Sequence, residues 1–461
     1  MFDFLFSNSP IEGIALALWG AFVDWWWLIL PFAFFYIAKD YWINYNREKF
    51  KEKIQWVNLG LKVPRDVLIT PKAMEQIFSG ISSIASTPDT WLEELLDKKI
   101  PYQKGEVPLW ISFEIVGNSN GISFFVRAPK KFQRLIETQF RSQYSQVEIT
   151  EVEDYISEFV SLPNQNQDMW GSELALNEAP IFPIKTYEFF EERVEERRLD
   201  SMAPFMEILS DLVDGEEIWL QLVLRGLTKP LADAWKEKSK EKMDELAGRE
   251  KPEKKKKDFE LIAGGLADES MKIVKQFFND IGSVSGIAGE EAAKEEKKEE
   301  RKERIQTSGD RDRIEMVERK LSKPVFETVI RVIYHAPKTV FNKDQQSAAI
   351  NSYFRNFSIS SSNGFKGKKK DYFFLYNWFF GDNVGYRDAN AFFESFKSRS
   401  PDSAPQFELS DDDAKDIMKK MILSAEELAT LYHFPITQVE APRLYRLQTK
   451  KYEPPPNLPV I

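Results

Sequence analysis

Two glycine-containing stretches of this sequence each carry some of the residue types that could bind a phosphate. A phosphate-binding loop reads G-x-x-x-x-G-K-[ST], because backbone amides, a lysine and a hydroxyl must meet around the phosphates. Residues 117–121 contain no lysine, and residues 364–368 have the wrong spacing and no hydroxyl after the lysine. Dinucleotide-binding and nucleophile-elbow patterns are missing as well. The sequence therefore predicts no catalytic constellation and no cofactor, and we expect a protein that is not an enzyme.

Metal-binding residue types are scarce. There are two histidines and no cysteine, which excludes disulfides, thiolate catalysis and cysteine-based zinc sites. His335 follows a predicted strand, and we interpret it as a packed or surface residue rather than a general base. Residues 411–413 are three consecutive aspartates, but no glycine or spaced glutamate completes a calcium loop. We interpret them as a solvated acidic loop and predict no metal site.

One basic loop has aromatic neighbours, a combination that can bind single-stranded nucleic acid by stacking and charge. The candidate contacts are Lys366, Lys368, Lys369 and Lys370, next to Tyr372, Phe373 and Phe374. The alternative is a sheet core with a basic turn, which the partial alternation of the aromatic residues favours. The net charge of −10 and the pI near 5.2 argue against a sequence-independent nucleic-acid binder.

An apolar stretch near the start of the sequence predicts a helix that would fix the position of the rest of the chain relative to a membrane. Residues 16–38 contain one charge, Asp24, and a bilayer core requires about 20 mostly apolar residues in a helix. The aromatic residues that suit the headgroup zone are Trp25, Trp26, Trp27, Phe34, Phe35 and Tyr36. We therefore predict a membrane anchor over residues 1–45. A buried core helix is the alternative, because Asp24 splits the apolar run.

The charges that flank this stretch predict its orientation. No lysine or arginine precedes it, whereas Lys39, Arg47, Lys49, Lys51 and Lys53 follow. The positive-inside rule then places the N-terminus outside and the bulk of the chain in the cytoplasm. Asp24 is either a functional intramembrane residue or an interfacial one, and the cost of a charge at the bilayer centre favours the second.

Residues 46–105 predict a juxtamembrane helical linker. Residues 55–68 resemble a short strand and turn, and Thr70-Pro71 begins an amphipathic helix. A first α+β domain follows over residues 106–235. Its predicted strands are 109–116, 122–127, 147–152, 184–190 and 217–227, its helices are 128–144 and 203–212, and residues 164–177 are expected to form a loop.

Residues 236–320 are rich in mixed charge and nearly free of aromatic residues around a more apolar island. We interpret them as a solvated, partly helical insertion; the alternatives are a coiled-coil partner arm or a basic patch at residues 254–257.

A second α+β domain is predicted over residues 321–440. It begins with strand 325–334 and helix 344–357, continues with loop 358–370 and aromatic strand 371–380, and contains a capping box at Ser424–Glu427. Ala-Pro occurs between a strand and a helix in each domain, at residues 128–129 and 336–337, which suggests a divergent duplication. The predicted class is thus α+β: a transmembrane helix, then two tandem ferredoxin-like sandwich domains with a charged helical insertion. Residues 441–461 form a proline-rich extended tail.

Several stretches resemble the membrane-anchored region that precedes the motor in bacterial type IV secretion and conjugation ATPases of the HerA/FtsK superfamily. They are residues 71–78, 111–129, 139–155, 326–337, 423–435 and 454–459. In such proteins the proline-rich segment leads into the motor domain, whereas this chain ends at Ile461.

The resemblance implies a protein of the bacterial inner membrane and no ATP hydrolysis by this chain. We expect a non-catalytic scaffold or adaptor subunit of a type IV secretion-like or conjugative DNA-transfer apparatus. Its implied partners are the membrane, a motor ATPase encoded separately and further copies of itself. The alternative function is a single-stranded DNA-guiding module of the same apparatus.

Overall fold

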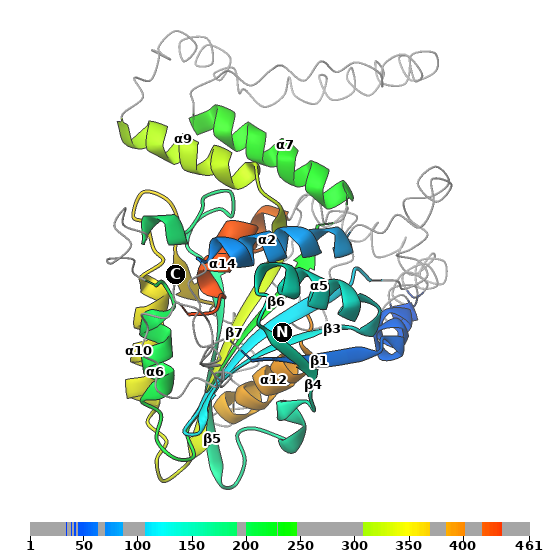
Figure 1. The fold of residues 1–461 in the computed structure, drawn as a ribbon, viewed down its shortest axis with the longest axis vertical. Coiled ribbons are helices and arrows are strands. Elements are labelled where there is room, and N and C mark those ends of the chain that lie inside the picture. Colours follow the sequence, from blue (N-terminus) through cyan, green and yellow to red (C-terminus); the bar gives the residue numbers. More distant parts are fainter. Residues whose placement is uncertain are drawn as a thin grey trace, which may run out of the picture.

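The computed structural model describes residues 34, 38, 41, 42, 45–62, 70–85, 107–190, 200–227, 229–246, 308–368, 384–401 and 417–435. Over these residues the protein has the predicted α+β class, with helices packed on one large antiparallel sheet of nine strands (Figure 1).

The first half of the sheet comes from residues 56–151. Its elements follow the order β1 (Trp56–Lys62), α2 (Lys72–Ile81), β2 (Trp110–Asn118), β3 (Gly121–Pro129), α5 (Gln133–Gln143) and β4 (Glu148–Glu151). Their spatial order is β4-β1-β3-β2. The predicted hairpin of β2 and β3 is confirmed, and the side chain of Asn118 accepts hydrogen bonds from the amides of Asn120 and Gly121 in its turn.

The second half repeats this arrangement. Its elements are β5 (Gln167–Leu176), α6 (Ala203–Ser210), β6 (Glu217–Gly226), β7 (Val325–Pro337), α10 (Lys343–Arg355) and β8 (Phe365–Gly367), with β8-β5-β7-β6 as the spatial order. Strands β2 and β6 pair antiparallel from Trp110↔Arg225 to Asn118↔Glu217, which joins the halves into one sheet. Each half thus has the element order βαββαβ, as an internal duplication would produce.

These halves divide the chain differently from the predicted domain boundaries. β1 falls within residues 46–105, which we assigned to a linker, yet it pairs with both β3 and β4. α6 and β6 fall within the predicted first domain but belong to the second half of the sheet. The charged stretch lies between β6 and β7, two strands that pair over ten positions. Sequence periodicity identified most strands, but partner choice depends on contacts between distant segments.

Two predicted elements of the first domain are wrong. Residues 164–177 contain β5 instead of a loop; most of its side chains are only half-buried, which explains its polar composition. Residues 184–190 form no strand but a short 3-10 turn, η4 (Tyr187–Phe189). There the amide of Ile184 donates to Glu427 and that of Tyr187 donates to Thr430. Side chains of Glu427 and Thr430 therefore accept the hydrogen bonds that we expected these backbone amides to make to a neighbouring strand.

The predicted helix over residues 128–144 begins later than expected. β3 continues through Pro129, and the amide of Lys130 still donates to Gln55 O at 2.7 Å. A 3-10 turn, η2 (Lys130–Phe132), then leads into α5. The predicted loop over residues 358–370 also contains the short strand β8, while predicted strand 371–380 lies outside the described residues.

The main core lies on one face of the sheet. α2, α5, α6, α10 and α14 (Ala425–Leu431) pack their apolar residues there. α14 is buried along its whole length beside α2, and its capping box of Ser424 and Glu427 is confirmed. A smaller core on the opposite face contains α12 (Val384–Ser398) and the segment around η3 (Tyr155–Glu158) (Figure 1).

Two helices of the charged stretch form an arm outside these layers. α7 (Lys229–Leu246) and α9 (Ser308–Leu321) run side by side in Figure 1. They share a third apolar cluster, in which Trp235 and Val317 are buried together with Ile417 and Ile422. The prediction of helix in this stretch is therefore confirmed for its two described ends. These ends are packed against each other rather than separately solvated.

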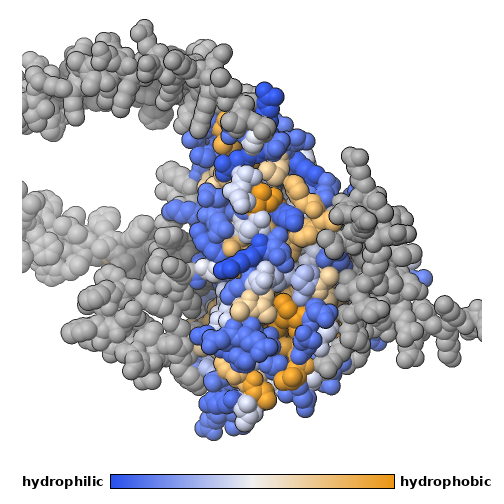
Figure 2. All heavy atoms as spheres, turned by 90° about the vertical axis from the view of Figure 1, so that its left-hand side faces the viewer, coloured by the Kyte–Doolittle hydropathy of each residue, from blue (hydrophilic) through white to orange (hydrophobic). Residues whose placement is uncertain are grey.

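The face that carries α6 and α10 has a mixed surface. Figure 2 shows small groups of hydrophobic residues there, separated by hydrophilic ones.

The N-terminal anchor falls almost entirely outside the described residues. Among the described residues, no helix has both the length and the hydropathy to cross a bilayer. Phe34 lies in a helical segment with 73% of its surface exposed, while Trp25, Trp26, Trp27, Phe35 and Tyr36 are not described.

Candidate functional site

Polar side chains line up across four strands, on the face of the sheet that α12 covers. Glu114 of β2 lies opposite Gln221 of β6, Gln221 lies opposite Arg331 of β7, and Arg331 lies opposite Glu173 of β5. Because strand side chains alternate between faces, this register places all four on one face. We call these four residues the polar row. It crosses the boundary between the two halves of the sheet.

Hydrogen bonds connect the polar row end to end. Gln221 Nε2 donates to Glu114 at 3.3 Å, and Arg331 Nη1 donates to Gln221 Oε1 at 3.3 Å. Arg331 Nε donates to Glu173 at 3.1 Å, and Glu173 also accepts from Lys368 at 2.8 Å. Glu114, Gln221 and Arg331 are each at most 1% exposed. A buried charge is tolerated only when it is paired and hydrogen-bonded, and each member here has such a partner.

Arg399 closes the network from above the sheet. Its Nε and Nη2 donate to Glu114 at 2.5 and 3.0 Å, and its Nη1 and Nη2 donate to Asp154 at 2.7 and 2.8 Å. Charge-assisted bonds of this forked kind are about twice as strong as neutral ones. Ser112 and Tyr155 donate to the same Glu114 carboxylate, at 2.5 and 2.8 Å. We call Arg399, Glu114 and Asp154 the Arg399 clamp.

The backbone of Arg399 has an unusual conformation that the clamp stabilises. Its φ of 51° is in the left-handed region, immediately after the end of α12. Glycine is the usual residue there, and a residue with a Cβ costs about 1 kcal/mol in this conformation. The carbonyls of Ser395 and Ser400 accept from Arg331, and that of Phe396 accepts from Gln221. The polar row therefore holds the C-terminal end of α12 as well as Arg399.

The pKa directions agree with this pairing. Burial opposes ionisation of Glu114, but the Arg399 guanidinium outweighs it and holds the Glu114 pKa below its usual value. The pKa of Asp154 is lowered in the same way, against burial, by hydrogen bonds from Arg399. The pKa of Glu173 is lowered, again against burial, by Lys368 and Arg331. Burial would lower the pKa of Arg399, but Glu114 raises it well above its usual value. These shifts keep Glu114, Asp154, Glu173 and Arg399 in their charged forms at neutral pH.

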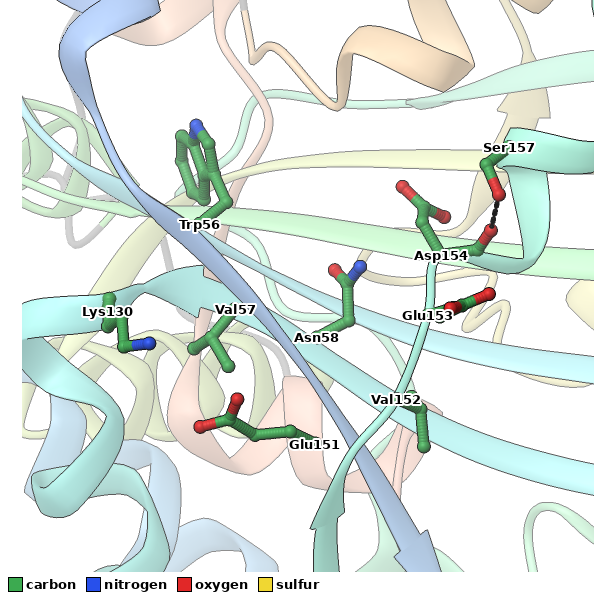
Figure 3. A pocket seen from close by; sticks show the side chains of 9 residues that line it. All are labelled: Trp56, Val57, Asn58, Lys130, Glu151, Val152, Glu153, Asp154 and Ser157. Atoms are coloured by element: carbon green, nitrogen blue, oxygen red, sulfur yellow. Dashed lines mark hydrogen bonds between the residues drawn. The ribbon is translucent and has the colours of Figure 1, made fainter.

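A pocket of about 360 Å³ opens beside the clamp, where the segment after β4 leaves β1 (Figure 3). Its lining residues are Trp56, Val57, Asn58, Lys130, Glu151, Val152, Glu153, Asp154 and Ser157, and we call it the edge pocket. The side-chain oxygen of Asn58 is buried and has no hydrogen-bond partner. A buried acceptor without a partner costs about 1–3 kcal/mol.

A second buried ionic cluster fastens the arm to the core. Lys320 of α9 donates to Ile422 O at 2.9 Å and pairs with Glu427 of α14 at 2.9 Å, with both side chains buried. Next to it, Lys323 pairs with Glu75 at 2.7 Å and with Glu426 at 2.5 Å. The pairs join helices from distant parts of the sequence.

The histidines are both buried in packing environments. The ring of His433 lies between Ala429 O at 2.8 Å and Asp200 at 2.9 Å. His335 packs edge-on against Trp219 at 4.4 Å between ring centroids, and Glu217 lies 3.5 Å from its Nε2. The prediction that His335 is a packed or surface residue is confirmed in its first form. Among the described residues, no group of three His, Cys, Asp or Glu side chains could hold a metal ion.

The structure describes two of the four predicted nucleic-acid contacts. Lys366 is exposed and donates to Asn177 O at 3.3 Å. Lys368 is half exposed and pairs with Glu173 at the end of the polar row. Lys369 and Lys370 lie outside the described residues. The sequence prediction missed Glu114, Asp154 and Arg399. A signal for the polar row exists, because Glu114, Gln221 and Arg331 each lie directly between two apolar residues of a strand.

Comparison with known proteins places the chain in a family. The profile of a domain of unknown function, DUF8128, matches residues 44–446. No curated protein and no solved structure matches the chain.

Proposed function

The chain belongs to the DUF8128 family of unknown function, and on that premise we propose that it is a non-catalytic scaffold or adaptor of the inner membrane. It serves a type IV secretion-like or conjugative DNA-transfer apparatus, and its partner is a motor ATPase encoded separately. Residues 1–45 anchor it, with the N-terminus outside and the bulk of the chain in the cytoplasm. The protein carries two ferredoxin-like units and assembles with further copies of itself.

One observation supports a scaffold above all: the buried charged groups of the polar row serve packing. Arg331 binds Gln221, Glu173 and the end of α12, and Arg399 binds Glu114 and Asp154 across the same face. A catalytic group must be able to change its protonation or its partners during turnover. Groups that are fixed by several opposite charges instead join the two halves of the sheet into a stiff platform. The choice of apparatus rests on the sequence resemblance.

ATP binding by the full-length protein in detergent tests the non-catalytic part of this proposal. We expect no saturable binding of radiolabelled ATP with Mg²⁺ at micromolar concentrations. Binding in that range would overturn the proposal. A motor ATPase with an intact phosphate-binding loop, assayed in the same detergent, shows that the assay detects such binding.

Membrane association tests the anchor. We expect the full-length protein to stay in the membrane after alkaline carbonate extraction, because residues 16–38 supply the length and hydropathy of a span. A variant with Leu28→Lys and Leu30→Lys is expected to be released, since each charge in a bilayer core costs about 3 kcal/mol. The matched variant with Leu28→Ala and Leu30→Ala should remain. Release of the unaltered protein by carbonate would remove the anchor from the proposal.

A single-stranded DNA-guiding module remains the alternative. The exposed side chain of Lys366 favours this alternative. Lys368 does not favour it, because its ammonium group is already paired with Glu173. Filter binding of an oligonucleotide over a salt series separates the two functions, because a DNA guide must lose affinity steeply with salt. We expect no such binding. Steep salt-dependent binding that Lys366→Glu abolishes would favour the alternative over the scaffold.

A further inference from the structure

Exposed aromatic side chains gather in the helical residues before β1. The described part of the chain has five exposed aromatic side chains, and four of them, Phe34, Tyr41, Trp42 and Tyr45, precede β1. Their exposed fractions are 73%, 76%, 62% and 43%, and the fifth residue is Phe189. A soluble surface rarely groups large rings in this way, because their apolar area is costly to hydrate. Such a group indicates a surface that another molecule covers.

Three of these rings and one cation form a continuous surface. Tyr41 directly precedes Trp42, and the rings of Trp42 and Tyr45 lie 6.2 Å apart between their centroids. Lys49 Nζ lies 4.5 Å from the centroid of the Tyr45 ring. We call Tyr41, Trp42, Tyr45 and Lys49 the aromatic strip. It has rings at its beginning and an exposed positive charge at its end.

The helix over residues 45–53 turns a different side toward the protein. Phe50 is half-buried, whereas Tyr45 and Lys49 are exposed. With 3.6 residues per turn, position 50 lies about 140° around the helix from position 45. Figure 1 shows this helix in dark blue beside the start of β1, at the edge of the sheet. The aromatic strip therefore lies on the side of the helix that does not pack on the protein.

The side chains of the aromatic strip match the headgroup zone of a bilayer. Tyrosine and tryptophan have an apolar body and a polar tip, and both concentrate where acyl chains meet water. A lysine next to them is attracted to anionic headgroups. The aromatic strip also follows closely after residues 16–38, the apolar stretch of the proposed anchor. A phospholipid surface is thus the partner that fits both its composition and its place in the chain.

Acidic residues limit the length of this contact. Glu48 is exposed and pairs with Lys51 at 3.1 Å. Beyond Lys49 the exposed side of the helix carries Glu52 and Lys53, whose opposite charges favour water. The contact is therefore confined to the aromatic strip.

We propose that the aromatic strip lies in the headgroup zone of the membrane, with its three rings among the phospholipid headgroups and Lys49 on their phosphates. The inference deepens the proposed anchor and rests on it for the membrane as the partner, but it adds a contact outside residues 16–38. Helical and extended residues rise about 1.5 and 3.4 Å each, so Trp56 lies no more than about 22 Å from Tyr45. The contact would hold the first strand of the sheet close to the membrane surface.

Nitroxide labelling of the full-length protein in nanodiscs of phosphatidylcholine and phosphatidylglycerol tests this contact. The chain has no cysteine, so a single Glu48→Cys replacement is labelled uniquely and leaves the aromatic strip intact. Collisions with oxygen report lipid, and collisions with a water-soluble nickel chelate report water. We expect the ratio of oxygen to nickel collisions at position 48 to exceed severalfold that of a label at Val160→Cys, where the side chain is 86% exposed. A ratio equal to that at Val160 would overturn the proposal, as would a label that collides with neither reagent, which indicates a protein partner instead.

A second background tests whether the rings cause the contact. Trp42→Ser with Tyr45→Ser should lower the ratio at position 48 to the value at Val160. Phe189→Ser is the matched control, because it removes an exposed ring elsewhere and should leave the ratio unchanged. An unchanged ratio in the double variant would also overturn the proposal. Carbonate extraction judges the anchor separately: an anchored protein with position 48 in water refutes only this inference, whereas release by carbonate with lipid contact at position 48 refutes only the anchor.

Discussion

At the residue scale, the decisive group is Arg399. It is 2% exposed, has a left-handed backbone and carries four hydrogen bonds to the carboxylates of Glu114 and Asp154. Removing one partner of a buried ion pair is expensive mainly because the other charge stays buried and unpaired. The energetic importance of this residue therefore exceeds that of any single apolar contact near it.

We expect Arg399→Ala to lower the free energy of unfolding by about 3–5 kcal/mol, as for other broken buried pairs. Urea denaturation of the full-length protein in detergent measures this. Glu114→Gln in the Arg399→Ala background should recover part of the loss, since it removes the stranded charge. If the double variant is as unstable as the sum of the single variants, the two side chains are not coupled and the clamp has no energetic role.

The pH dependence of stability follows from the same carboxylates. The pKa of Glu114, of Asp154 and of Glu173 is lowered in the folded protein, so the unfolded chain binds protons more readily. Their stabilisation is thus present above the ordinary carboxyl values of 4.5 and 3.8, and it is lost as the pH falls through the folded values. Melting temperatures between pH 7 and pH 3 should fall on the acid side. Glu114→Gln should flatten this fall, and an unchanged slope would contradict the assignment.

At the element scale, α12 is placed by one close approach and one polar attachment. Gly171 of β5 lies beneath Phe392, and a Cβ at position 171 would come within 2.3 Å of that ring. The end of the helix is held by Arg331, which donates to Ser395 O and Ser400 O. The position of α12 therefore depends both on the missing side chain at Gly171 and on the hydrogen bonds from the polar row.

Gly171→Ala should destabilise the protein by about 1–3 kcal/mol, the typical cost of overpacking a core. Thermal unfolding measures the change. Gly367→Ala is the matched control, because the nearest atom to its Cβ would lie 3.4 Å away, in ordinary contact. Phe392→Leu should relieve part of the Gly171→Ala defect. A neutral Gly171→Ala variant would show that α12 does not pack on β5 as described.

At the scale of the whole molecule, the two halves behave as one unit. β2 and β6 pair along nine positions, and the polar row bridges the same boundary with buried charges. Partial separation of the halves would expose the strand edges and leave those charges without partners. The sheet is thus expected to lose its structure cooperatively.

A single unfolding transition is the expected result when denaturation is followed by tryptophan fluorescence and by far-ultraviolet circular dichroism. Trp56 and Trp110 report on the first half of the sheet and Trp219 on the second. Coincident midpoints indicate one cooperative unit. Fluorescence of variants that keep only Trp110 or only Trp219 should give the same midpoint. Separate midpoints would show two independently stable halves.

The sequence by itself determined the local elements. Alternation along residues 109–127 identified the hairpin. Helical spacing after Thr70-Pro71 identified the helix that begins near residue 71, and a capping box identified the one that begins near residue 424. These depend on periodicity and on hydrogen bonds within a few residues. The class α+β also follows from such local patterns. The anchor and the basic residues Lys369 and Lys370 stay predictions.

Only the tertiary structure decided which strands are neighbours and which charges meet. Glu114 and Arg399 are 285 positions apart, and each is unremarkable in its own segment. Residues 164–177 have the polar composition of a loop because most side chains of β5 are only half-buried. This strand forms through its pairing with β7, which a local pattern does not reveal. The edge pocket exists because β4 stops before β1 does, a difference in pairing length between segments. Such features depend on long-range register, which no local pattern encodes, since the partner of each strand is set by packing of the whole sheet.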